Sequence, residues 1–129
     1  MHGTGPVVVG YDLLSPLGID LKEQWQKALQ GKSGIGKLSR FAVNPDFPVQ
    51  IAGQLPEIDH LNYPFLAPRH QAMWSSPVFK YGLLAVERAL QRSGIEIDQT
   101  LAPRVAVTFS SAVGGLDSVL HADRQLLQA

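Results

Sequence analysis

The 129-residue chain is long enough for one domain, because folding at this size buries roughly two thirds of the surface that an unfolded chain exposes. Hydrophobic residues make up 45% and charged residues 17%, a balance that is typical of globular proteins and excludes a disordered chain. Lys plus Arg and Asp plus Glu both number 11, so the net charge is zero and no nucleic-acid surface is indicated. A near-neutral chain is poorly protected against self-association, so we expect a homodimer or a larger assembly.

The absence of cysteine excludes disulfides, thiolate metal sites and a cysteine nucleophile within these residues. Residues 1–6 contain no basic segment, and the apolar run at 7–9 is too short for a signal peptide or a membrane span. We therefore expect a soluble, cytoplasmic protein with no membrane association, although secreted domains can also lack cysteine.

The first elements are a short strand and a capped helix. Residues 7–9 are three valines between proline and glycine, which predicts a buried strand. Asp20 followed by Glu23 predicts a helix start, because the Asp carboxylate can accept from the free amides of the first turn. Gly31 lies where a left-handed C-terminal cap belongs. Apolar residues at helical spacing predict a core face on this helix: Leu21, Trp25, Ala28 and Leu29.

The regular pattern weakens over residues 32–77, which contain five prolines before Ser76 and one strand-like piece at 49–52. So long an irregular stretch is typical of a functional segment or of one that packs against something else. Order returns with Ser76 and Pro77, an N-cap followed by proline at the first helical position. The predicted helix ends at Gly94, and its apolar stripe consists of Phe79, Leu83, Val86 and Leu90.

Residues 104–110 predict a second buried strand, and the pair Gly114 and Gly115 leads into a last helix. The apolar side of that helix is expected to contain Leu116, Val119, Leu120 and Leu126 or Leu127. Strands that alternate with helices favour a layered α/β fold with a largely parallel sheet. Two convincing strands and a weak one would leave sheet edges unpaired, so we expect the chain to be an incomplete part of such a fold.

A phosphate-loop motif is the first candidate site that the sequence offers. Gly31, Lys32 and Ser33 match the end of G-x-x-x-x-G-K-S/T, a loop that wraps backbone amides around phosphates between a strand and a helix. The required first glycine is replaced by Gln26, and a helix precedes the motif instead of a strand. The pattern therefore favours a helix cap followed by a turn.

The loop 110–115, Ser-Ser-Ala-Val-Gly-Gly, is the second candidate, because it follows a predicted strand and opens a helix. In α/β sheets ligands bind at the carboxyl end of a strand, beside the free amides at the start of the following helix. Ser110 and Ser111 are weak candidates for nucleophiles, since no G-x-S-x-G elbow surrounds them. A tight packing turn and a loop that lines a substrate channel both remain open.

The other polar and aromatic candidates fit structural roles better. The four histidines match no zinc spacing, so neither a metal site nor a cofactor is expected: His2, His60, His70 and His121. Glu57 and Asp59 flank Ile58 in a short acidic loop and are expected to be solvated. Trp74 has no helical pattern around it, so it could pack against a missing part or a partner.

Together these pieces resemble the start of the elongating β-ketoacyl-acyl-carrier-protein synthases of the thiolase-like superfamily. Residues 7–18 fit that family's opening V-V-T-G-x-G-x-x-S/T-P-L-G in length, with Val9 for Thr and Asp12 for the second Gly. Trp25, residues 30–35 (Q-G-K-S-G-I) and residues 51–53 (I-A-G) follow in the family's order. Residues 80–95 and 104–107 match its next helix and strand, so the resemblance covers nearly the whole chain.

Two departures from the family pattern loosen any substrate assignment. The family's loop reads G-S-G-x-G-G, whereas here Ser110 and Ala112 stand where glycine lets the backbone bend freely. The charged signature before the second long helix is replaced by residues 73–77, Met-Trp-Ser-Ser-Pro.

The resemblance implies a two-stage reaction. A cysteine at a strand-to-helix elbow takes an acyl group from a carrier protein, and two histidines help to decarboxylate a malonyl unit and stabilise the enolate. In the family these three residues lie beyond the part that corresponds to residues 1–129, so no catalytic residue maps onto this chain. One substrate-binding position does: Val113 occupies the loop position that lines the acyl channel in relatives.

Two hypotheses follow. In the first, residues 1–129 are the N-terminal portion of the N-terminal domain of a condensing acyltransferase of fatty-acid or polyketide synthesis, without the catalytic elbow and C-terminal half, and inactive alone. Its partners would be acyl carrier protein and acyl and malonyl thioesters. In the second, which the altered glycine loop motivates, the chain belongs to a non-catalytic binding or scaffolding subunit that keeps the fold.

Overall fold

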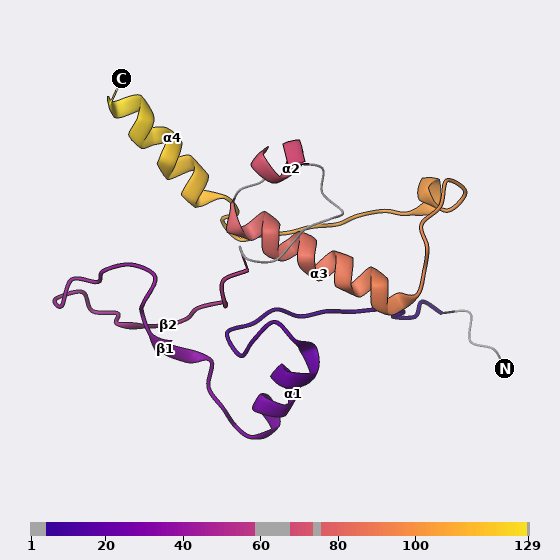
Figure 1. Cartoon of the computed structure of the whole chain (residues 1–129), viewed down its shortest axis with the longest axis horizontal. Helices are drawn as coiled ribbons and strands as arrows, with labels where there is room; N and C mark the ends of the chain where they lie inside the picture. Colours follow the sequence, from indigo (N-terminus) through magenta and orange to yellow (C-terminus); the bar gives the residue numbers. More distant parts are fainter. Residues whose placement is uncertain (1–4, 59–67, 74–75, 129) are drawn as a thin grey trace. The chain divides into compact units, whose positions relative to one another are not determined.

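The computed structural model describes residues 5–58, 68–73 and 76–128. Within these ranges the chain forms α-helices, one 3₁₀-helix and one small sheet (Figure 1). The elements in chain order are α1 (Leu21–Leu29), β1 (Ile35–Lys37), β2 (Ile51–Gly53), α2 (Pro68–Met73), α3 (Pro77–Ser93), η1 (Ala102–Arg104) and α4 (Leu116–Gln128). The chain divides into two compact units: unit 1 contains Met1–Tyr11 and Asn62–Ala129, and unit 2 contains Asp12–Leu61.

Helix α1 of unit 2 has the two caps that the sequence predicts. Asp20 Oδ1 accepts from the amide of Glu23 at 2.8 Å, and the Glu23 carboxylate pairs with Lys27 at 2.7 Å. At the other end Gly31 adopts a left-handed φ of 68°, and the amide of Lys32 donates to the carbonyl of Lys27 at 3.0 Å. That bond, from the second residue beyond the cap back into the last turn, is the Schellman closure that a glycine at this position permits.

The face of α1 that is buried differs from the predicted one. Gln24 is only 2% exposed; its Nε2 donates to the carbonyl of Leu13 at 2.8 Å, and its Oε1 accepts from Ser15 Oγ at 2.6 Å. Trp25, which we expected in the core, is 63% exposed. The prediction was wrong because polar contacts, and not an apolar face, hold helix α1 to the preceding turn. Lys27 Nζ adds one more such contact, since it donates to the carbonyl of Leu17 at 2.7 Å.

The sheet of unit 2 is an antiparallel two-stranded ribbon. Strands β1 and β2 pair in the register Ile35↔Gly53 and Lys37↔Ile51. The predicted piece at 49–52 is confirmed with a shift to Ile51–Gly53, whereas β1 was missed because it has three residues with a glycine in the middle. The ribbon lies against the turn before α1, since a Cβ on Gly53 of β2 would stand 3.0 Å from Pro16 Cγ.

Helix α3 is the longest element of unit 1 and runs between the predicted boundaries. Ser76 occupies the N-cap, Pro77 the first helical position, and Gly94 closes the helix with a φ of 66°. Leu84 is the buried apolar residue of this helix. Most of the predicted stripe stays partly exposed, including Phe79, Val86 and Leu90.

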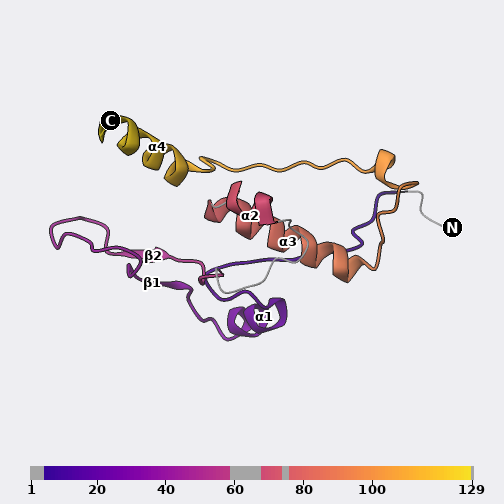
Figure 2. The same cartoon turned by 45° about the horizontal axis from the view of Figure 1, so that its top comes forward.

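Two extended segments of unit 1 lie against α3 at glycines. A Cβ on Gly10 would stand 2.3 Å from the carbonyl oxygen of Ala89, and one on Gly82 would stand 2.6 Å from the ring of Phe109. Only glycine allows backbone and ring to come this close. Figure 2 shows the segment after η1 running along α3 before α4 begins.

These two segments are the predicted strands at 7–9 and 104–110, and in the described residues neither forms a strand. Arg104 belongs instead to η1, and Val7, Val8 and Val9 are exposed. The physical reason is that a strand requires a neighbour to satisfy its amides and carbonyls, and no described segment pairs with either of them. The α/β class is confirmed, whereas the layered thiolase-like fold with a mostly parallel sheet stays a prediction.

Little apolar surface is buried in the described part of the chain. Its buried hydrophobic side chains are Ile58 and Leu84, and the apolar side of α4 is exposed throughout. No helix in the described ranges is both long and apolar enough to cross a membrane.

Because these apolar faces are uncovered, we expect the isolated 129-residue chain to self-associate. Multi-angle light scattering over a concentration series should give an apparent mass that rises with concentration. A stable monomer at all concentrations would contradict this expectation.

Replacing Gln24 by alanine should destabilise unit 2 by about 1–3 kcal/mol, because it leaves the carbonyl of Leu13 and the hydroxyl of Ser15 without their buried partner. Hydrogen exchange of the α1 amides measures the effect. The exposed Gln26 of the same helix provides the matched control, since its alanine variant should exchange like the parent chain. Equal protection in the two variants would show that the buried amide contributes nothing.

Candidate loop at the start of helix α4

The loop 110–115 has a defined turn in its second half. Ser111 Oγ accepts from the amide of Gly114 at 3.0 Å, so Ala112 and Val113 lie within a short turn closed by a side chain. Gly115 then adopts a left-handed φ of 75°, and its carbonyl accepts from the amides of Ser118 and Val119, which begins α4. The predicted transition from the glycine pair into a helix is confirmed.

The departures from the family's loop at Ser110 and Ala112 are accommodated without a left-handed backbone. Among the described residues every positive φ belongs to a glycine, so neither Ser110 nor Ala112 adopts one. Gly114 is close to the closing side chain, because a Cβ there would stand 3.1 Å from Ser111 Oγ. Glycine therefore occupies the two loop positions that tolerate a side chain poorly. A Cβ at Gly114 would be crowded by Ser111, and one at Gly115 would be strained by the positive φ.

Val113 is 66% exposed on this turn. Its branched side chain lies between the two residues whose hydrogen bond closes the turn, so the turn fixes the backbone that carries it. The structure places Val113 in the loop that the sequence singled out, and its proposed role toward an acyl chain stays a prediction.

The start of α4 is joined to the start of α3 by one hydrogen bond. Ser76 Oγ donates to Asp117 Oδ1 at 2.7 Å, and Ser76 is only 3% exposed. The backbone of Ser76 does cap α3, since its carbonyl accepts from the amides of Phe79 and Lys80. The contact with Asp117 was missed at the sequence level, because no local motif connects residues 41 positions apart.

The remaining sequence candidates fall into structural roles or outside the described residues. The interpretation of residues 31–33 as a cap and a turn is confirmed, because Ser33 Oγ accepts from the amide of Ile35 at 3.0 Å. His70 is half-buried on α2, and His121 and Glu57 are exposed. The described residues contain no group of three side chains that could hold a metal ion. Four candidates lie outside the described residues: His2, Asp59, His60 and Trp74.

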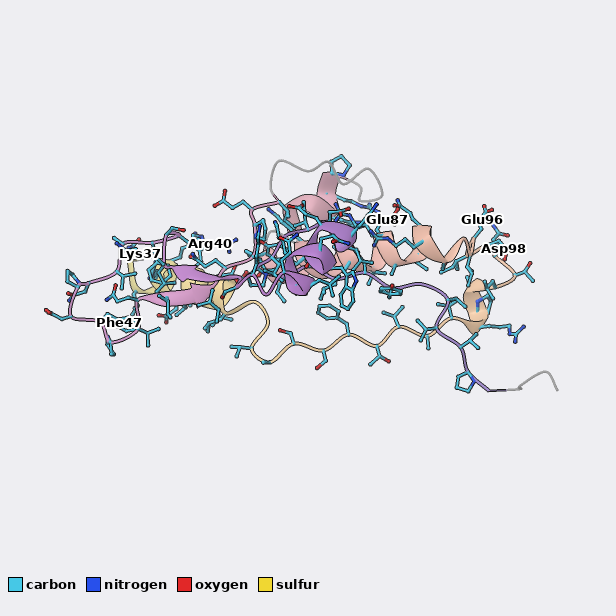
Figure 3. The ribbon with its side chains drawn as sticks, turned by 90° about the horizontal axis from the view of Figure 1, so that it is seen from below. Lys37, Arg40, Phe47, Glu87, Glu96 and Asp98 are labelled. Atoms are coloured by element: carbon cyan, nitrogen blue, oxygen red, sulfur yellow. The ribbon has the colours of Figure 1, made fainter. Side chains whose placement is uncertain are left out.

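The charged side chains labelled in Figure 3 lie on both units, and two of the acidic ones have local partners. Glu87 accepts from Gln91 Nε2 at 2.8 Å, one turn along α3. Asp98 Oδ1 accepts from the amides of Thr100 and Leu101, which stabilises the turn that leads into η1. These two carboxylates therefore have structural roles and form no acid–base pair with each other.

A hollow of about 520 Å³ in unit 2 was not anticipated from the sequence. It lies between β1 and the loop that returns to β2, and Gln50 at its wall donates to the carbonyls of Asn44 and Phe47. Its lining combines apolar and polar residues: Lys37, Leu38, Ser39, Phe41, Ala42, Val43, Pro45 and Gln50. The irregular segment that supplies most of this lining has no motif by which the sequence could have revealed it.

Comparison with known proteins places this loop and its flanking helices in a family. The family described as "Beta-ketoacyl synthase, N-terminal domain" matches residues 6–128. The chain belongs to the β-ketoacyl synthase family. Residues of every helix and strand in the described structure fall within the matched segment, as does the whole loop 110–115.

Two curated members of the family carry the same name, 3-oxoacyl-[acyl-carrier-protein] synthase 2. The protein from Coxiella burnetii is 35% identical over 111 residues, which is 85% of this chain and 26% of the relative. The protein from Staphylococcus aureus is 30% identical over 124 residues, which is 94% of this chain and 29% of the relative. The chain thus spans somewhat more than a quarter of the length of these β-ketoacyl synthases.

Proposed function

We propose that this chain supplies the N-terminal part of a 3-oxoacyl-acyl-carrier-protein synthase, which extends an acyl chain by decarboxylative Claisen condensation. The observation that carries the proposal is the family match over residues 6–128 together with relatives of that name. In this proposal residues 1–129 are the first portion of the enzyme's N-terminal domain. The reaction serves fatty-acid or polyketide synthesis.

The proposed chemistry has two bond-forming steps. A cysteine thiolate attacks the carbonyl of an acyl thioester, the acyl–cysteine bond forms, and the carrier thiol leaves. A malonyl thioester then loses carbon dioxide, and the resulting enolate carbon attacks the acyl–cysteine carbonyl and releases the thiolate. The 129 residues contain no cysteine, so the chain alone is expected to be inactive.

The contribution of this chain in the proposal is to shape the acyl path. Val113 stands on the turn closed by Ser111 and Gly114, at the start of α4. A branched side chain at that position would restrict how an acyl tail passes. The fixed backbone of the turn supports this role, because a wall that selects by size must keep its position.

Partners and location belong to the same proposal. Acyl carrier protein and acyl and malonyl thioesters are the proposed partners, which accords with the carrier protein named in the relatives' names. A homodimer accords with the zero net charge and the exposed apolar faces. We also propose a cytoplasmic location, which accords with the lack of cysteine in these residues.

The central test is acyl transfer by the product of the complete reading frame that contains residues 1–129. Incubation with acyl carrier protein charged with an acyl group should increase the enzyme's mass by that acyl group, on a cysteine beyond residue 129. Addition of malonyl carrier protein should then yield a 3-oxoacyl product. The 129-residue chain is the negative control and should stay unmodified.

Two results would count against the proposal. A stop codon directly after Ala129 would remove the residues that the chemistry needs. Carrier-protein binding by the complete product without any thioester would favour the non-catalytic scaffold, the hypothesis that the altered glycine loop motivates.

Replacing Val113 by alanine in the complete product should shift kcat/KM toward longer acyl chains by about tenfold, because a small change in an apolar pocket is worth roughly 1–3 kcal/mol. Val113→Phe should shift the preference toward shorter chains. Val119→Ala, on the exposed face of α4, is the matched control. An unchanged chain-length profile in both Val113 variants would remove this residue from the acyl path.

A further inference from the structure

The hydroxyl of Ser76 is used in an unusual way for a helix N-cap. An N-cap serine normally accepts from the amides of its own first turn, which is worth about 1 kcal/mol. In α3 that side-chain bond is not made, and the nearly buried hydroxyl donates to Asp117 instead, at a length typical of a strong bond to a carboxylate. The Ser76 side chain therefore does not cap α3 and contacts α4 instead.

A second contact holds the other end of the loop against the same helix. The ring of Phe109 lies so close to Gly82 of α3 that a Cβ there would stand 2.6 Å away. The loop 110–115 therefore lies between two attachments to α3, one at Gly82 and one at Ser76. Figure 1 shows α4 beginning beside the first turn of α3, where the extended segment ends.

The distance between the attachments limits the conformation of the loop. Gly82 and Ser76 are six positions apart, which is roughly 9 Å along a helix. The chain from Phe109 to Asp117 could span roughly 26 Å if it were extended. The segment therefore does not need to run extended between the attachments, and the turn closed by Ser111 and Gly114, with Val113 within it, takes up part of its length.

We propose that Ser76 and Asp117 form a positioning pair that holds the loop 110–115 in this conformation. The consequence for acyl chains, that the pair fixes where Val113 stands, rests on the proposed function. The positioning itself does not, because it follows from the two attachments and the length of chain between them.

The absence of cysteine makes a site-specific test possible in the 129-residue chain, at concentrations where light scattering shows no self-association. A nitroxide attached to a Val113→Cys variant reports motion of the loop by electron paramagnetic resonance. Asp117→Ala and Ser76→Ala should each increase the mobility of this label. Asp117→Asn and Ser76→Thr should increase it much less, because an amide oxygen still accepts, although more weakly than a carboxylate, and a threonine hydroxyl still donates.

Two controls separate positioning from general destabilisation. A label on a Lys32→Cys variant in unit 2 should be unaffected by Asp117→Ala, and circular dichroism should show unchanged helix content. In the double alanine variant the label at 113 should be no more mobile than in either single variant, because both changes break one bond. Equal mobility in Asp117→Ala and Asp117→Asn would overturn the proposal, as would the same increase at position 32.

Hydrogen exchange provides an independent measurement without a label. The amides of Gly114, Ser118 and Val119 should exchange about tenfold faster in Asp117→Ala than in Asp117→Asn. Equal rates would also overturn the proposal. Neither measurement involves acyl transfer; a loop that loosens in Asp117→Ala while the complete enzyme keeps its chain-length profile would refute only the role of Val113.

Discussion

Close approach to helix α3 is the constraint on which unit 1 depends. The helix carries few buried side chains of its own, and extended chain reaches it at two points where a glycine removes the Cβ: at Gly10 against Ala89, and at Gly82 against Phe109. The hydrogen bond from Ser76 to Asp117 adds a third attachment at the start of the helix. The residues at its two ends determine where α3 begins and ends, whereas these three contacts determine which segments of unit 1 pack against it.

The local chemistry of the chain could be predicted well from its sequence. Asp20, Gly31 and Gly94 set helix ends, because capping depends on the cap residue and its immediate neighbours. Ser76 occupies the predicted N-cap position of α3, but its side chain makes no capping bond. The glycine pair at 114–115 was predicted to lead into the last helix, and Gly115 adopts a left-handed φ there.

Features that depend on distant neighbours could not be predicted in this way. Periodicity located α1 but assigned Trp25 to its buried side, whereas Gln24 and its polar partners hold the helix. The valines at 7–9 and the segment 105–110 have strand composition, but composition alone does not supply a partner strand. In the candidate site, the loop and Val113 were identified from the sequence, whereas the contact between Ser76 and Asp117 joins positions that no local pattern connects.

The order of the two units along the chain has a consequence for synthesis on the ribosome. Unit 2 interrupts unit 1, and its anchor is local, since Gln24 binds a carbonyl 11 residues earlier. Gly10, by contrast, can contact Ala89 only after 79 more residues have been synthesised (89 minus 10). At about 5–20 residues per second, unit 2 can form during the roughly 4–16 s before Ala89 becomes available to Gly10. Unit 2 can therefore fold during synthesis before the segment around Gly10 has found its place on α3, so the two units need not form in the order of their first residues.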